Sequence, residues 1–265
     1  MTLTTRLALA SLLMAGPAAA ADLTMAEPVV AVPVEAPINF TGFTVGGFLG
    51  AAYSDGQADL GAYDGSLIRL DVSNGLFPQA IDDSDTSFLG GVSVGYNHQF
   101  GQFVAGVEAD ISWLDLNPRA GLNLRDPNPD PQFNGVQTIT SYETEVEALG
   151  TVRARLGMAF DQTLVYATGG LAIGDVKNRF ALAIPEFGYN SPDWSTSDTL
   201  YGYVVGGGIE HKLTQSISVR AEGLYYDLEN TTVYASDPVA FPGQRISYGF
   251  DNDGFIGRIG LAYSF

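Results

Sequence analysis

Apolar and polar residues alternate along eight stretches of the chain, and such alternation is typical of β-strands whose two faces differ. In the third stretch, Phe103, Val107 and Trp113 share one face. Glu108 and Asp110 share the other. The eight stretches that this pattern predicts to be strands are 43–54, 86–99, 103–116, 144–160, 164–177, 199–213, 216–229 and 254–265.

The connections between these stretches are short and long in turn. The short ones lie around Gly101, Asp161 and Thr214, and each needs only a tight turn. The long ones are rich in Asp, Asn, Pro, Gly and Ser, which favours loops; they cover 55–85, 117–143, 178–198 and 230–253. This order predicts an antiparallel up-and-down arrangement with tight turns at one rim, long loops at the other, and both chain ends at the rim of the turns.

The two faces of the predicted sheet indicate where it lies. In a soluble barrel of eight strands the interior is apolar and the outer surface is polar. Here the polar face carries both signs of charge among glycines, and the apolar face carries aromatic residues near the strand ends, as in barrels that cross a membrane. Closure also leaves no unpaired sheet edge in lipid. The sequence therefore predicts an all-β, eight-stranded transmembrane β-barrel over 42–265, with short periplasmic turns and four long extracellular loops.

The charged residues of the polar face form the main candidate site. They are compatible with a paired-carboxylate active site or with a plug of ion pairs. An eight-stranded barrel is only wide enough for side chains to fill, and buried charges persist only when paired, so we favour the plug and expect little or no conductance. The residues predicted to face the lumen are Glu108, Asp110, Glu145, Glu147, Glu210, Glu222, Arg153, Arg155, Arg220 and Arg258.

The first 41 residues differ from the rest. Residues 1–20 combine Arg6, a short apolar run and Ala18–Ala20, which predicts a cleaved signal peptide. No stretch of the chain approaches the roughly 20 apolar residues of a membrane-spanning helix. Residues 21–41 are rich in Pro, Val, Ala and Glu, which predicts an extended periplasmic linker rather than regular structure.

Composition narrows the possible chemistry. Without the signal peptide, 11 basic residues (12 less Arg6) face 30 acidic ones, a balance of −19 that disfavours nucleic acid as a partner. The chain has no cysteine, and its two histidines, His98 and His211, precede short turns with their side chains predicted to face outward. No serine, histidine and acid converge, and no metal-ligand spacing is present. We therefore expect no enzyme, no metal site and no cofactor.

Several segments together resemble the small outer-membrane surface antigens of Gram-negative bacteria, the porin-like outer-membrane immunogenic proteins with OmpA-like eight-stranded barrels. They are "FTGFTVGGFLG", "FLGGVSVGYNHQFGQFVAGVEADISW", "LGTVRARLGMAFDQTLVYATGGLAIGDVK", "VVGGGIEHKLTQSISVRAEGLYYDL" and "RIGLAYSF". The resemblance covers nearly all strands between residues 40 and 265, whereas the four long loops match no pattern.

The resemblance implies a location in the outer membrane, with both termini periplasmic, and a role in envelope integrity and surface antigenicity. It implies lipid and lipopolysaccharide as surroundings, and the barrel assembly machinery as a partner that recognises Phe265. It also implies attachment to peptidoglycan through a mature N-terminus at Ala21 and Asp22, with a plain leader before the first strand as the favoured alternative. A small diffusion porin and a surface haem or ligand binder remain alternatives, the latter through loop tyrosines such as Tyr63, Tyr189 or Tyr234.

Overall fold

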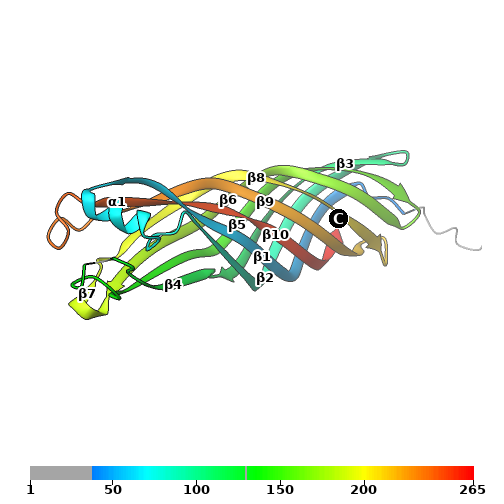
Figure 1. Ribbon diagram of the computed structural model, residues 1–265. Helices are drawn as coiled ribbons and strands as arrows, with labels where there is room; N and C mark the ends of the chain where they lie inside the picture. Colours follow the sequence, from blue (N-terminus) through cyan, green and yellow to red (C-terminus); the bar gives the residue numbers. More distant parts are fainter. Residues whose placement is uncertain (1–37, 129) are drawn as a thin grey trace, which may run out of the picture. The chain divides into compact units, whose positions relative to one another are not determined.

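The computed structural model describes residues 38–128 and 130–265, and eight long antiparallel strands within them form a closed ring (Figure 1). Around the ring their order is β5-β3-β2-β1-β10-β9-β8-β6, and pairing of β5 with β6 closes it. The strands are β1 (Gly42–Asp64), β2 (Ala80–Phe100), β3 (Phe103–Leu116), β5 (Gln137–Phe160), β6 (Thr163–Ile184), β8 (Trp194–Lys212), β9 (Ile217–Ala235) and β10 (Arg245–Ser264). The eight-stranded, antiparallel, up-and-down barrel expected from the alternation is confirmed.

Four shorter elements lie in the long connections. Strand β4 (Arg119–Arg125) pairs with β5, and β7 (Tyr189–Asn190) pairs with β6. Helix α1 (Ser66–Ser73) follows β1, and the 3-10 helix η1 (Pro185–Phe187) follows β6. No helix in the part of the chain that the structure describes is both long and apolar enough to cross a membrane.

The tight turns and the chain end lie at one rim. Strand β2 ends at Phe100 and β3 begins at Phe103; the turn at Asp161 also has two residues, and the turn at Thr214 has four. The backbone N–H of Phe265 donates to the carbonyl oxygen of Phe43 at 2.9 Å, so the end of β10 lies beside the start of β1. Phe40, which precedes β1, is buried against Val104 and Leu164. Its backbone N–H donates to Gln99 Oε1 at 2.8 Å.

Seven of the eight ring strands extend beyond their predicted bounds towards the loop rim, so the four long loops are shorter than predicted. Strand β1 has 23 residues and β5 has 24, whereas a strand needs about 9–11 residues to cross a bilayer. We call 42–54, 86–114, 148–174, 200–226 and 254–265 the turn-side half, which includes the three tight turns. The loop-side half consists of 55–85, 115–147, 175–199 and 227–253. About half of the residues expected to form loops belong to strands that continue into the loop-side half, where polar residues on the outer face suggested loops.

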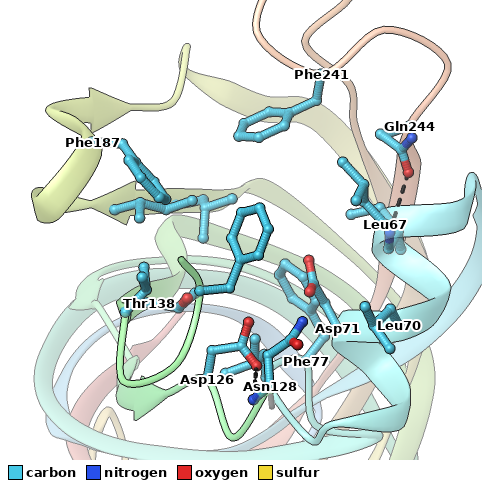
Figure 2. A pocket seen from close by; sticks show the side chains of 16 residues that line it. Leu67, Leu70, Asp71, Phe77, Asp126, Asn128, Thr138, Phe187, Phe241 and Gln244 are labelled. Carbon is cyan, nitrogen blue, oxygen red and sulfur yellow. Dashed lines mark hydrogen bonds between the residues drawn. The ribbon is translucent and has the colours of Figure 1, made fainter. Parts of the chain in front are cut away.

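The outer faces of the two halves have opposite polarity. In the turn-side half the outer face carries large apolar side chains: Phe88, Leu156 and Ile259 are 89%, 66% and 67% exposed. In the loop-side half such side chains point inward, and Phe180 and Tyr248 lie in an apolar core against which Ile68 and Val72 of α1 pack. Beyond this core, the four long connections gather around a pocket (Figure 2).

Candidate functional site

Charged side chains from five strands meet inside the turn-side half. They are Glu108 and Asp110 on β3, Arg153 and Arg155 on β5, Glu210 on β8, Arg220 and Glu222 on β9, and Arg258 on β10. We call these eight residues the lumen network. Each is less than a tenth exposed, so four carboxylates and four guanidinium groups balance one another away from solvent.

Five of the ten ion pairs within the lumen network join neighbouring strands, and three of these five join residues that face each other directly. Glu108 lies directly opposite Arg153, Glu210 opposite Arg220, and Glu222 opposite Arg258. Opposite charges at directly facing positions stabilise an antiparallel pair. The corresponding N to O distances are 2.8 Å for Arg153 Nη2 to Glu108 Oε1, 3.1 Å for Arg220 Nε to Glu210 Oε2, and 2.6 Å for Arg258 Nε to Glu222 Oε2.

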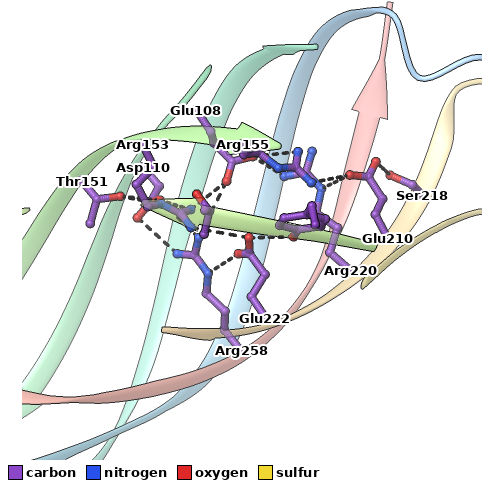
Figure 3. A network of polar contacts seen from close by, with 12 residues as sticks. Glu108, Asp110, Thr151, Arg153, Arg155, Glu210, Ser218, Arg220, Glu222 and Arg258 are labelled. Atoms are coloured by element: carbon purple, nitrogen blue, oxygen red, sulfur yellow. Dashed lines mark hydrogen bonds and ion pairs between the residues drawn. The ribbon is translucent and has the colours of Figure 1, made fainter. Parts of the chain in front are cut away.

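The remaining contacts cross the lumen between strands that are not neighbours, as Figure 3 shows. Arg258 Nη1 on β10 lies 3.2 Å from Asp110 Oδ1 on β3, and Arg220 on β9 bonds to Glu108 on β3. The Arg258 guanidinium also lies 4.0 Å from the centre of the Phe48 ring. The network therefore spans the full width of the barrel.

Little space is left at this level. The cavity beside Arg220, Glu222 and Arg258 has a volume of about 10 Å³, roughly what one water molecule needs. On the loop-side of the network, a layer of apolar side chains that includes Leu149, Val204 and Leu228 fills the lumen. The interior is thus closed by two successive layers of different chemistry.

Two residues predicted to face the lumen lie elsewhere. Glu147 is exposed and Glu145 is half-buried opposite Lys177, and neither joins the network. Their positions follow from an extra residue in β5, where the pairing with β6 shifts between Val146 and Ala148. Such a β-bulge reverses which face each following residue occupies. Val146, predicted to face lipid, is consequently buried inside.

Other residues complete the network without having been singled out in the sequence. Tyr166 donates its hydroxyl hydrogen to Glu222 Oε1 at 2.7 Å, and its ring lies 3.8 Å from the Arg155 guanidinium. Ser218 donates to Glu210 Oε1 at 2.7 Å, and Thr151 donates to Asp110 Oδ2 at 2.8 Å. All three have lumen-facing parity, which is the signal that could have identified them.

The histidines stand apart from the network. Both His98 and His211 are exposed on the outer face near the turn rim, as their parity predicted. Thr163 Oγ1 lies 3.0 Å from His211 Nδ1. Neither imidazole faces a lumen carboxylate, so the arrangement provides no acid–base pair that includes a histidine.

The described residues include the C-terminal end of the chain but not residues 1–37. Phe265 lies on the outer face beside Tyr263, with ring centres 5.0 Å apart. Ala21 and Asp22 lie outside the described residues. The expected signal peptide, 1–20, and residues 21–37 of the expected linker also lie outside them.

The three loop tyrosines do not share one site. Tyr63 and Tyr234 are exposed on the outer surface of β1 and β9. Tyr189 donates to Asp237 Oδ2 at 3.1 Å, and partial burial together with that carboxylate raises the pKa of Tyr189 to about 12. A raised pKa disfavours the phenolate form that would bind an iron centre.

A closed antiparallel barrel with an apolar outer surface and an ion-paired interior is a transmembrane β-barrel of the outer-membrane type. A family model described as "Outer membrane protein beta-barrel domain" matches residues 7–265, and the chain belongs to this family. The protein is accordingly located in the outer membrane of a Gram-negative bacterium. The short turns then lie on the periplasmic side and the loop-side half is extracellular.

Two relatives extend along most of the chain. The 31 kDa outer-membrane immunogenic protein of Brucella melitensis is 30% identical over 253 residues, covering 94% of this chain and 93% of that protein. The 22 kDa outer membrane protein of Rhizobium leguminosarum bv. viciae is 30% identical over 230 residues, covering 86% and 82%. The solved outer membrane protease OmpT of Escherichia coli is 10% identical with a TM-score of 0.49, covering 84% of this chain and 97% of that one.

Proposed function

We propose that this protein is a non-enzymatic component of the outer membrane that strengthens the envelope and presents its extracellular half at the cell surface. The lumen network carries this proposal, because its ion pairs join β3, β9 and β10 across the interior and leave about 10 Å³ beside them. A barrel tied together in this way suits a structural role better than passage of solutes. The name of the Brucella relative supports exposure to antibodies as a further property.

Conductance tests the closed lumen. We expect purified full-length protein in a planar bilayer to show no steady openings under conditions in which a general-diffusion porin conducts. Reproducible step conductance that scales with protein amount would contradict the proposal and would favour the diffusion porin instead. The protein should also shift its migration on heating in detergent, which shows that the tested barrel is folded.

We propose a second role, a covalent link to peptidoglycan through the mature N-terminus at Ala21. Its support is the position of Phe40, which is held on the periplasmic side by Gln99 and lies 5.4 Å from Lys212 Nζ. The roughly 20 residues before it could extend about 60 Å at ~3.1 Å each, far enough to leave the membrane surface.

Mass spectrometry of protease-treated cell-wall sacculi tests this link. We expect a peptide that begins at Ala21 and carries a muropeptide. Detection of Ala21 solely as a free amine in the membrane fraction would show that the segment is only a linker. An Asp22→Leu variant, which changes the predicted motif but leaves the barrel intact, serves as the comparison.

The surroundings of the barrel follow from its outer surface. We propose that the exposed apolar side chains of the turn-side half contact outer-membrane lipid and lipopolysaccharide, and that Phe265 contacts the assembly machinery. Haem binding remains the alternative ligand-binding role. It predicts an absorbance change on haem addition that is lost in Tyr63→Phe, Tyr189→Phe or Tyr234→Phe variants.

A further inference from the structure

The pocket at the extracellular end is built by all four long connections. Its volume is about 150 Å³. Leu67 and Phe77 contribute one wall from the segment around α1, Phe133 a second from the β4–β5 connection, Phe187 a third from η1, and Phe241 a fourth from the β9–β10 connection. Figure 2 shows Leu67, Phe187 and Phe241 arranged around one space. Four separate segments of sequence thus converge on it.

The walls of the pocket are mainly apolar and rich in aromatic rings. Phe133 and Phe187 meet edge to face with ring centres 6.5 Å apart. Phe241 packs edge to face on Tyr189 at 4.8 Å, and Phe77 is buried in the core below. Gln244 Oε1 accepts a hydrogen bond from the Ile68 backbone N–H at 3.2 Å, which links α1 to the opposite loop. These contacts hold the walls in place.

Two carboxylates interrupt this apolar lining on one side. Asp126 is only 8% exposed, and Oδ1 accepts both of its hydrogen bonds, from Asn74 Nδ2 at 3.2 Å and from the Asn128 N–H at 2.9 Å. Its Oδ2 accepts none from the residues that the structure describes. Asp71 is half-buried, and its side chain makes no hydrogen bond or ion pair within the described ranges.

The carboxylates of Asp71 and Asp126 repel each other when both are charged. Burial, together with the neighbouring charge of Asp126, raises the pKa of Asp71 to about 6. No arginine or lysine is among the residues that line the pocket. Burying a charge without a partner costs free energy, so a cation placed here would stabilise both carboxylates.

We propose that the pocket binds a small organic cation with an apolar body, whose ammonium group contacts Asp71 and Asp126 while its body lies among Phe77, Phe133, Phe187 and Phe241. Ammonium groups interact favourably with carboxylates and with aromatic faces. An apolar cavity of this volume holds about one benzene ring, which sets the size of the body. A hydrated metal ion would instead need several oxygen ligands, and the described residues contain no cluster of three or more metal-ligating side chains.

The test compares two probes of the same shape. Binding of 2-phenylethylammonium and of neutral 2-phenylethanol to full-length protein in nanodiscs is measured by calorimetry at pH 7.5, with empty nanodiscs subtracted. We expect the ammonium probe to bind at least tenfold more tightly than the alcohol. Equal affinities, or saturable binding of neither probe, would overturn the proposal.

Substitutions test whether Asp71 and Asp126 cause the preference for the ammonium probe. Asp71→Asn, which keeps the size of the side chain, should reduce the preference for the ammonium probe to about onefold. Glu229→Gln removes an exposed carboxylate from the outer face of the extracellular half and should leave the preference unchanged. A preference that survives both Asp71→Asn and Asp126→Asn would show that the cation binds elsewhere and would overturn the assignment.

Acidification supplies an independent readout. The groups that face Asp71 across the pocket are Asp126 from the β4–β5 connection, with the neutral Gln244, Asn128 and Thr138. Protonation of Asp71 should therefore weaken binding of the ammonium probe between pH 7.5 and pH 5 by about fivefold or more. Binding of the alcohol should not change, and an ammonium affinity independent of pH would contradict the role of Asp71.

Discussion

The turn-side and loop-side halves share the same strands, but their outer faces have opposite polarity, and the turn-side half buries the charged lumen network beside its apolar layer. Along β10, Arg258 faces inward and Ile259 outward in the turn-side half, whereas Tyr248 faces inward and Asp251 outward in the loop-side half. The alternation is continuous, and only the surroundings of the outer face change from lipid to water. The comparison shows that alternation with a period of two predicts a strand. Whether the outward-facing residues are apolar or polar then indicates whether lipid or water surrounds it.

The two interiors are stabilised in different ways. Burying a large apolar side chain in the loop-side half contributes about 1.5–3 kcal/mol. In the lumen network the attraction between charges is offset by the cost of removing them from water, so the pairs add little, but removal of one partner leaves a buried charge uncompensated. The turn-side half should therefore be the more sensitive to loss of a single side chain.

The largest effect is expected for Arg153→Met in the lumen network. This change leaves Glu108 and Asp110, which lie 2.8 and 2.7 Å from Arg153 Nη2, with one cation fewer. The free energy of unfolding should fall by about 3–5 kcal/mol, as measured by urea titration in lipid vesicles.

The matched change in the other half is Arg179→Met, which removes an arginine whose Nε lies 3.1 Å from Asp193 on the outer surface. An exposed pair contributes about 0–1 kcal/mol, so this control should unfold almost as the wild type does. Similar losses in the two variants would mean that the halves do not differ in the way described.

The next effect is expected for Phe180→Ala in the apolar core of the loop-side half. Phe180 is 1% exposed and stacks on Trp194 with ring centres 5.7 Å apart. The cavity should cost about 3 kcal/mol and should open the extracellular half to protease without abolishing heat-modifiable migration. Tyr234→Ala, at a residue 76% exposed, should do neither, and loss of the whole barrel in Phe180→Ala would show that the halves unfold together.

A smaller effect is expected for Asp71→Asn. Because the folded pKa of Asp71, about 6, exceeds its ordinary value of 3.8, the folded state binds the extra proton, and stability of the α1 segment should fall as pH rises from 4 to 6. After allowance for partial exposure, the change is ~1 kcal/mol. Hydrogen exchange of α1 should show this slope in the wild type and lose it in the variant.

The smallest effect is expected for Glu147→Gln. Its carboxylate lies outside the lumen because of the β5 bulge, so the free energy of unfolding should change by less than about 0.5 kcal/mol. Glu108→Gln, the same substitution inside the network, should cost several times more. A large cost for Glu147→Gln would indicate that β5 has no bulge and that the alternation continues unbroken.

The sequence alone predicted which side chains face inward and outward wherever the alternation is unbroken. In β3, one face carries Val107 and Trp113 and the other Glu108 and Asp110, and their outward and inward positions follow directly. The predicted orientation was wrong for Glu145 and Glu147. A single added residue in β5 reverses the face on which neighbouring side chains lie, and nothing in the composition reveals it. The pocket could not be predicted either, because Asp71 lies on α1 and Asp126 follows β4, and the fold rather than their spacing along the chain brings them together.

The order of the chain gives the lumen network a further consequence for biogenesis. Before β10 joins, the other four strands contribute four carboxylates and three of the four guanidinium groups of the lumen network, and the buried Lys212 lies near Glu210. Arg258, on the final strand, supplies the fourth guanidinium group and contacts both Asp110 and Glu222. Closing the seam between β1 and β10 therefore also completes the lumen network.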